Sequence, residues 1–337
     1  MMGQRGPADC TVVIRAAGER TEAVCARLAA LEVGTDAVVT IHEVPFAQAV
    51  RRCFEIGIEA GRDWTLALDA DVLLAPGAIG ALCAEARTEW DRSPDLFEMD
   101  AMVADKLLGQ IRPAGVHLYR TALLPEALEH AAFDARRRRP ESWVKMQMRR
   151  RGRRLADAAV VAGLHDFEQF HRDIFRTVFT HARKHERFMG YAARYWRRMA
   201  PTDPDLRMAF LSFRLSTAIN EHADLAAMAP AETVTIDRSA FPDDVDAILR
   251  PAGMVEKAPL SADEVGPGMV AAALRDFAVA AEYERERPLI HAWRETGGAT
   301  IPRLRAAVKG YGILGGLRTF GGRAVAALGR RLAAEDD

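Results

Sequence analysis

The 337-residue sequence lacks several features that would assign it to a class directly. It has no apolar run of the roughly 18 to 20 residues that span a bilayer as a helix. Residues 1–7 have no apolar core, so we expect neither a membrane span nor a secretory signal. The formal net charge is −1, which provides no overall attraction to nucleic acid. We therefore expect a cytoplasmic protein without a nucleic-acid partner.

Cysteine is scarce as well. The four cysteines all lie in the first quarter of the chain, at Cys10, Cys25, Cys53 and Cys83. None belongs to a Cys-x-x-Cys pair, and each falls within an apolar periodic segment. We expect small core side chains here rather than metal ligands or disulfides.

The sequence does contain a regular alternation of strand-like and helix-like segments. The predicted strands of the first 90 residues are 10–16, 37–42 and 64–68, and the predicted helices are 21–31, 46–60 and 76–86. This alternation implies a parallel, doubly wound α/β sheet with right-handed crossovers. Further strands are predicted at 96–104, 116–118 and 156–162, followed by a helix over 167–179 and a mainly helical remainder.

Two carboxylates follow the third predicted strand, in the run Asp69-Ala-Asp71. They would share a face if the strand geometry continued. Like charges this close repel one another, and a divalent cation that also binds substrate phosphates is the usual remedy. Asp-x-Asp is nonetheless common by chance, and aspartate also suits strand ends and turns. The tripeptide alone therefore leaves a turn and a metal site open.

Its position favours the metal site. In a doubly wound sheet, ligands bind beyond the carboxyl ends of the strands. Arg15, the loop 42–45 and the segment 69–71 follow three successive predicted strands. We expect these three strand ends to converge on one crevice.

A second group of polar residues follows the predicted strand 156–162. His165 and Asp166 come next, and Glu168 lies just beyond. This junction would lie beside the N-terminus of the helix predicted from 167, which favours anions. His181 and His185, four residues apart, could also bind a metal, but we expect exposed helix side chains there because no third ligand is evident.

Two segments are strongly basic. Residues 136–154 carry ten cationic side chains, which indicates either a solvated loop or a basic lip that attracts an anionic ligand. Aromatic residues are not interleaved there as stacking platforms for nucleic acid. The tail 303–331 carries seven cations and no acid among apolar residues. It could contact the inner face of a membrane peripherally, or it could be a flexible or partner-packed tail, since its glycines weaken any helix.

Residues 11–15, 46–60 and 63–71 together resemble the nucleotide-binding half of a GT-A glycosyltransferase. The similarity is greatest to the large family of bacterial polysaccharide and lipopolysaccharide transferases, and it covers roughly residues 10–180. It implies a GT-A-type, doubly wound, mostly parallel sheet with a helical C-terminal region. The implied domains are a nucleotide-sugar-binding catalytic domain over 8–180, a mainly helical region over 181–300 and a basic, glycine-rich tail over 301–337.

The resemblance also implies a metal site that binds Mn²⁺ or Mg²⁺ on the donor diphosphate. Asp71 would be the main metal ligand. Asp69 would contact the donor ribose, the sugar or the metal. His165 would be the third ligand.

Four further residues take implied roles. Asp166 or Glu168 would be the base of an inverting reaction, and the sequence does not choose between them. Arg15 and Arg20 would lie near the nucleotide. The family usually ends its second strand with an aspartate that holds uracil, but 42–43 reads His-Glu here, so the nucleotide stays open. No Gln-x-x-Arg-Trp run is present, so we do not expect a processive synthase.

The predicted function is a metal-dependent glycosyltransferase. It would move a sugar from a nucleotide-diphosphate donor to a cell-envelope or polysaccharide-type acceptor, either a glycan or a lipid-linked molecule. Two alternatives remain. One is a non-catalytic nucleotide-sugar-binding protein. The other is a nucleotidyltransferase, which normally has a glycine-rich loop after the first strand, and residues 15–20 match such a loop poorly.

Overall fold

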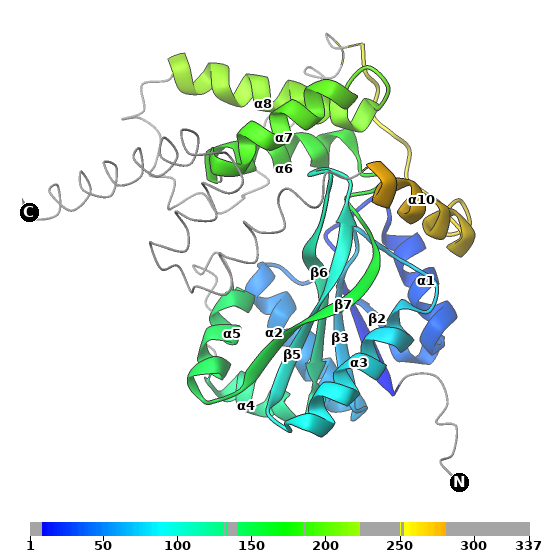
Figure 1. Cartoon of the computed structure of the whole chain (residues 1–337), viewed down its shortest axis with the longest axis vertical. Helices are drawn as coiled ribbons and strands as arrows, with labels where there is room; N and C mark the ends of the chain where they lie inside the picture. The colour runs from blue at the N-terminus through cyan, green and yellow to red at the C-terminus, as the bar shows by residue number, and fades with distance from the viewer. Residues whose placement is uncertain are drawn as a thin grey trace, which may run out of the picture. The chain divides into compact units, whose positions relative to one another are not determined.

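The computed structural model describes residues 9–130, 133, 140–184, 186–222, 250 and 253–280. The described residues up to Val279 belong to one compact unit (Figure 1). The predicted basic tail, 301–337, and His185 lie outside the described residues, and so do 134–139 of the first basic segment. The predicted boundaries at 180 and 300 stay predictions.

The first five elements follow the predicted alternation closely. They are β1 (Cys10–Arg15), α1 (Glu22–Val33), β2 (Val38–Ile41), α2 (Phe46–Ala60) and β3 (Trp64–Asp69), with a 3-10 turn at Thr35–Ala37. β1 pairs in parallel with both β2 and β3, and Arg15 is the register partner of Ile41 on one side and of Asp69 on the other. The three strand ends therefore lie side by side, as the sequence predicts.

The rest of the sheet is antiparallel in part. It contains β4 (Val72–Leu74), β5 (Leu96–Asp105), β6 (Gln110–Arg120) and β7 (Arg154–His165), and the strand order is β2-β1-β3-β6-β5-β7-β4. The β3·β6, β5·β6 and β4·β7 pairs are antiparallel, and β5·β7 is parallel. The α/β class is confirmed, and the sheet is mixed, with its parallel β2-β1-β3 part in the segment that the βαβ alternation predicted.

The sheet curls strongly. β3 and β4 are separated in sequence by Ala70 and Asp71 alone, yet β4 lies at the far end of the strand order. The three Cα–Cα steps from Asp69 to Val72 span at most about 11 Å. The end of β3 and the edge strand β4 must therefore approach one another, which brings the end of β7 toward the ends of β1 and β3.

Helices cover both faces of the sheet (Figure 1). On one face α1 and α3 (Ala78–Arg92) bury residues such as Ile14, Leu68 and Leu82. On the other, α2 packs with α4 (Leu124–His130), which follows the 3-10 turn Thr121–Leu123, and with α5 (Pro140–Arg150). All four cysteines are buried and free, which confirms the expected core role.

The remaining described helices are α6 (His171–Lys184), α7 (Glu186–Met199), α8 (Pro204–His222) and α10 (Pro267–Ala280). α6, α7 and α8 form their own apolar core around Trp196, whose indole N–H donates to Leu107 O at 2.6 Å. α10 adds Val270 to the core shared with α1 and α3. None of the helices within the described ranges has the length and apolarity to cross a bilayer.

Two sequence expectations need correction. The helix predicted from 167 begins at His171, and β7 continues to His165, because Asp166 and Glu168 adopt left-handed φ angles of 54° and 61° that no helix allows. The basic segment is not simply a solvated loop. Its part from Pro140 to Arg150 is helix α5, which buries Val144 and Met148.

Candidate functional site

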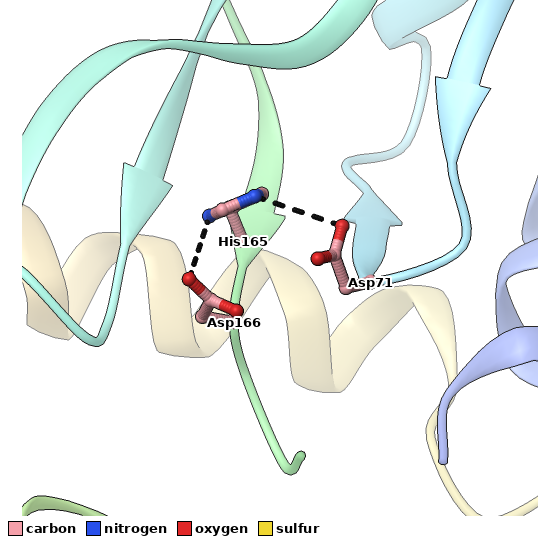
Figure 2. Close-up of side chains that lie close together, drawn as sticks. All are labelled: Asp71, His165 and Asp166. Atoms are coloured by element: carbon pink, nitrogen blue, oxygen red, sulfur yellow. Dashed lines mark ion pairs between the residues drawn. The ribbon is translucent and has the colours of Figure 1, made fainter. Parts of the chain in front are cut away.

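Three predicted site residues come together where β4 meets β7. In this antiparallel pair Val72 lies opposite His165, so the residues beside them, Asp71 and Asp166, flank the same ring. One donor atom from each of Asp71, His165 and Asp166 lies within 4.8 Å of the other two. Figure 2 shows the imidazole of His165 lying between the two carboxylates.

The ring of His165 is held from one side. Its Nδ1 lies 3.1 Å from Asp105 Oδ2 and 3.2 Å from Asp166 Oδ2, so Nδ1–H donates to carboxylate oxygens. Asp105 is fully buried at the end of β5, in register with His165, and Arg112 Nε donates to its Oδ2 at 2.6 Å. This arrangement leaves Nε2 facing Asp71 Oδ1 at 3.6 Å. A carboxylate behind the ring is the usual support of a metal-binding histidine.

One oxygen of this group lacks a hydrogen bond from the described residues. Asp71 Oδ1 is buried and has no hydrogen-bond partner among the residues that the structure describes. A buried carboxylate oxygen without a hydrogen bond costs free energy that a bound cation would offset. Two carboxylates and an imidazole nitrogen are suitable donors for Mn²⁺ or Mg²⁺. The residues present therefore fit a divalent ion.

The pKa values of Asp71 and His165 also indicate a site that attracts cations. Burial raises the pKa of Asp71 to about 8, and the negative charges of Asp166 and Asp69 add to the rise, although His165 opposes it. Burial lowers the pKa of His165, but Asp166 and Asp71 outweigh that effect and raise it well above its ordinary value. The group thus binds protons more tightly than its members would in water, as an acidic pocket that attracts cations does.

Asp69 does not join this group. Its Oδ1 accepts a hydrogen bond of 2.6 Å from Arg15 Nη2, and Arg15 Nη1 donates to Glu141 of α5. Ala70 N still donates to Arg15 O, but residues 70–71 form a turn, so the alternation of the strand ends after Asp69. Asp69 stays with β1, whereas Asp71 turns toward β7. β6 approaches closely at Gly115, where a Cβ would lie 3.2 Å from Asp69 Cβ and 2.9 Å from Val72 Cγ2.

Arg20 and Glu168 form a separate contact. Arg20 Nη1 donates to Glu168 Oε2 at 3.1 Å, and Lys257 Nζ donates to the same oxygen at 3.2 Å. Arg20 Nε also donates to Ala258 O at 2.6 Å. Left-handed φ angles at Asp166 and Glu168 cost of order 1 kcal/mol or more each. These contacts therefore hold a strained loop beside the metal-type group, which is the set Asp71, His165 and Asp166.

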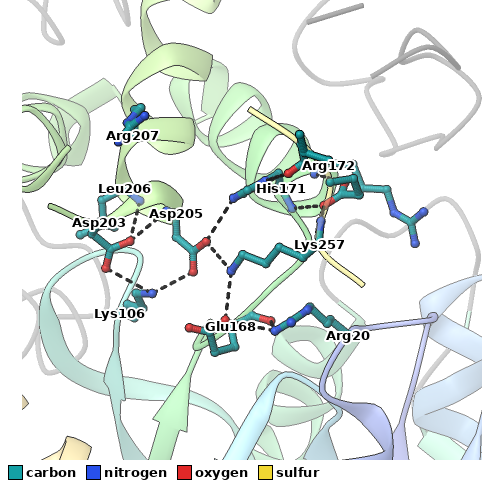
Figure 3. Close-up of polar contacts among 12 residues, drawn as sticks. Arg20, Lys106, Glu168, His171, Arg172, Asp203, Asp205, Leu206, Arg207 and Lys257 are labelled. Carbon is teal, nitrogen blue, oxygen red and sulfur yellow. Dashed lines mark hydrogen bonds and ion pairs between the residues drawn. The ribbon is translucent and has the colours of Figure 1, made fainter. Parts of the chain in front are cut away.

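The cations around Glu168 belong to a larger network (Figure 3). Asp205, at the start of α8, contacts Lys257 Nζ at 2.5 Å and Lys106 Nζ at 2.8 Å. Burial acts against its charge, but a hydrogen bond from His171 and the two lysines hold the pKa of Asp205 below its ordinary value. The alternating charges tie the N-terminus of α8 to the loop that carries Glu168.

Sequence reasoning missed several of these residues. Asp105 holds His165, Arg112 holds Asp105, and Glu141 holds Arg15, but none of the three lies in a motif. Asp105 could have been found, because it is an acidic residue at the carboxyl end of a predicted strand. Also missed were two acids within the buried strand β5, Glu98 and Asp100, which need charged partners.

Comparisons with known proteins add a distant likeness to a solved structure. No protein-family model matches the chain, and no curated protein sequence matches it. Among solved structures, the chain is similar to a mannosyltransferase from Pyrobaculum calidifontis in complex with GDP-Man and Mn²⁺. The sequence identity is 13%, the TM-score is 0.31, and the match covers 82% of this chain and 89% of that one. At this low similarity we transfer no residue role from one chain to the other. We assign the chain to the α/β class from its own mixed sheet and flanking helices.

Proposed function

We propose that the chain is a metal-dependent glycosyltransferase that moves a sugar from a nucleotide-diphosphate donor to a glycan or lipid-linked acceptor. The observation that carries this proposal is the buried Oδ1 of Asp71, which lacks a hydrogen-bond partner among the described residues and faces an oriented histidine at the carboxyl ends of the strands.

Asp71, His165 and Asp166 would hold the ion, and Asp105 would keep the ring of His165 in position. A bound divalent ion supplies positive charge that stabilises the diphosphate leaving group. The sequence resemblance gave Asp69 a choice of roles. Because its carboxylate contacts Arg15 instead of joining the metal-type group, we assign it to the donor ribose or sugar hydroxyls. Its side chain is 31% exposed, so a hydroxyl can reach it.

Arg15 would lie near the nucleotide and hold Asp69 in place through its guanidinium. This group is almost fully buried, and its carbon lies 5.0 Å from the centre of the Phe46 ring. Two carboxylates, Asp69 and Glu141, fix its orientation. A guanidinium held on two sides in this way fixes the Asp69 carboxylate in one orientation before the donor binds, which lowers the entropy cost of binding.

Between the two candidate bases, we assign the proton transfer to Glu168. Asp166 lies within the metal-type group, whereas the Glu168 side chain is 35% exposed and its ion pairs to Arg20 and Lys257 are made through Oε2. Glu168 Oε1 would take the proton of the acceptor hydroxyl as that oxygen bonds to the anomeric carbon and the bond to the diphosphate breaks. A base in this position goes with inversion at that carbon.

Calorimetry with a panel of nucleoside diphosphates, with and without Mn²⁺, tests the proposal. We expect binding that requires Mn²⁺ and that Asp71→Asn abolishes. The matched control Asp91→Asn changes an exposed aspartate of α3 and should bind as the wild type does. Lack of Mn²⁺-dependent binding of every diphosphate would refute the proposal.

Turnover separates the enzyme from a non-catalytic binding protein. Incubation with a library of labelled sugar nucleotides should show slow donor hydrolysis that is lost in Asp71→Asn. Metal-dependent binding with no hydrolysis or transfer of any donor would favour the binding protein instead.

A further inference from the structure

A second set of metal-type donors lies on the sheet, outside the site described above. Glu98 and Asp100 are two residues apart on β5 and therefore share a face, and His117 of β6 is the register partner of Asp100. The ladder of β5 is irregular between Asp100 and Met102, immediately after this pair. Bulges of this kind often re-aim side chains next to functional sites.

The three side chains are buried and close together. Their exposed fractions are 1% for Glu98, 10% for Asp100 and 11% for His117. His117 Nδ1 lies 2.6 Å from Asp100 Oδ1 and 3.1 Å from Glu98 Oε1. These separations are close to the spacing of about 3 Å between neighbouring ligands of one metal ion with bonds of 2.0 to 2.2 Å.

A cation already marks the centre of this donor set. Lys145 Nζ lies 2.7 Å from Glu98 Oε1, 3.0 Å from both oxygens of Asp100 and 3.4 Å from His117 Nδ1. One positive atom thus touches donor atoms of all three residues. It also lies against the nitrogen of a ring that is itself positive when protonated, so two like charges are in contact there.

Two observations point beyond an ordinary ion pair. Glu98 Oε2 is fully buried and, within the described part of the chain, accepts no hydrogen bond. His117 turns Nδ1 toward the donor set and Nε2 toward Glu141 Oε2, at 3.7 Å. Arg15 in turn holds Glu141. Glu141 thus lies on the side of the imidazole where metal-binding histidines have a supporting carboxylate, at a longer distance than Asp105 has from His165.

We propose that Glu98, Asp100 and His117 form a second binding site, for a divalent transition metal such as Zn²⁺, which Lys145 occupies when the metal is absent. Metal entry moves the Lys145 ammonium out of the donor set and releases the proton from His117 Nδ1. One charge of +2 then replaces two charges of +1, so the charge inside the set does not change. Two carboxylates and one imidazole suit Zn²⁺ and its spectroscopic substitute Co²⁺. Lys145 can leave because its side chain is 19% exposed, on a surface helix.

Metal stoichiometry tests the proposal with the full chain. After chelation and dialysis, Zn²⁺ and Co²⁺ are titrated into the wild type, Asp71→Asn and Glu98→Gln, and bound metal is counted by calorimetry and elemental analysis. We expect two equivalents in the wild type and one in each variant. One equivalent in the wild type that Asp71→Asn removes and Glu98→Gln leaves in place would overturn the second site and leave the proposed function standing. One equivalent that only Glu98→Gln removes would support the second site and count against the proposed function.

Lys145→Met provides a test by gain of binding, which a lost fold cannot imitate. Methionine keeps an unbranched side chain and removes the competing ammonium, so we expect Zn²⁺ to bind the second site at least about tenfold more tightly, with stronger Co²⁺ absorption bands. The variant is measured in the Asp71→Asn background, where only the second site remains. A folded Lys145→Met protein with no gain in affinity would overturn the proposal.

Discussion

Replacement of Gly115 by alanine tests how closely β6 supports the site. Gly115 has a φ of +62°, and an added Cβ would lie 2.9 Å from Val72 Cγ2 and 3.2 Å from Asp69 Cβ. These residues flank Asp71, so both neighbours of the metal-type group would have to shift. Alanine in the left-handed region costs about 1 kcal/mol, and overpacking of a dense interior costs about 1 to 3 kcal/mol more.

Gly61 is a matched control. It ends helix α2 with a φ of +65°, and no described atom lies within 4 Å of the position of its Cβ. Gly61→Ala therefore carries the backbone cost of about 1 kcal/mol without the packing cost. The difference between the two variants isolates the close approach of β6 to Asp69 and Val72.

Urea unfolding followed by circular dichroism gives the measurement. We expect Gly115→Ala to lose about 2 to 4 kcal/mol of unfolding free energy and Gly61→Ala about 1 kcal/mol. Mn²⁺ binding should weaken in Gly115→Ala alone, because only that substitution displaces residues beside Asp71. Equal losses of stability in the two variants would refute the close approach.

Three further predictions concern residues that support the site. Asp105→Asn should weaken Mn²⁺ binding about 10- to 100-fold, because His165 loses its orienting carboxylate, and calorimetry that finds unchanged affinity would contradict this role. Burial raises the pKa of Glu141, but Arg15, His117 and Lys145 outweigh it and lower the pKa from 4.5 to about 2. The stabilisation by ionised Glu141 is therefore present above pH 4.5 and is lost as the pH falls toward 2. The difference in unfolding free energy between the wild type and Glu141→Gln, of order 3 kcal/mol, should shrink over that range in urea titrations. A difference that stays constant would contradict the ion pairs. Gly163→Ala would place a Cβ 2.2 Å from Leu73 O and should separate β4 from β7. We expect a loss of about 3 kcal/mol or more of unfolding free energy and weaker Mn²⁺ binding. The control Gly80→Ala in α3, which has open space around it, should leave the midpoint of thermal unfolding nearly unchanged or raise it.

Local patterns predicted the parallel part of the fold. The β-branched run 10–15 and the apolar stripe of 46–60 are complete within their own segments, so periodicity alone identifies them as strand and helix. Parallel strands then require a crossover helix on each side, which determines that Arg15 and Asp69 end neighbouring strands. The sequence therefore predicted this edge of the sheet correctly.

The divergence of Asp69 and Asp71 was not predictable in the same way. It depends on the pairing of β4 with β7, a register between segments far apart in the chain, and three apolar residues such as 72–74 give no periodicity to read. The start of α6 at His171 was unpredictable for the same reason, because it also depends on contacts between distant segments. Nothing local to Asp166 and Glu168 predicts left-handed backbone angles there, because contacts from Arg20 and Lys257 hold that loop.

The buried charges of β5 were partly predictable. Glu98 and Asp100 alternate with apolar residues in a strand that is buried along its whole length, so partners of opposite charge had to exist. Which partners they are could not be known, because Lys145 comes from a segment whose basic composition resembled a solvated loop.

The three-residue ladder between β4 and β7 has a consequence for the order in which the molecule assembles. Val72 reaches its place only when His165 has been synthesised and β7 has docked, so the chain between them must first close as a long loop. Closure of so long a loop carries an entropy cost that three residue pairs repay poorly. An ion bound by both Asp71 and His165 would link β4 to β7. Its binding energy would slow the opening of the β4 edge. Amide hydrogen exchange at 72–74 should therefore slow down more on metal binding than exchange in any other part of the sheet.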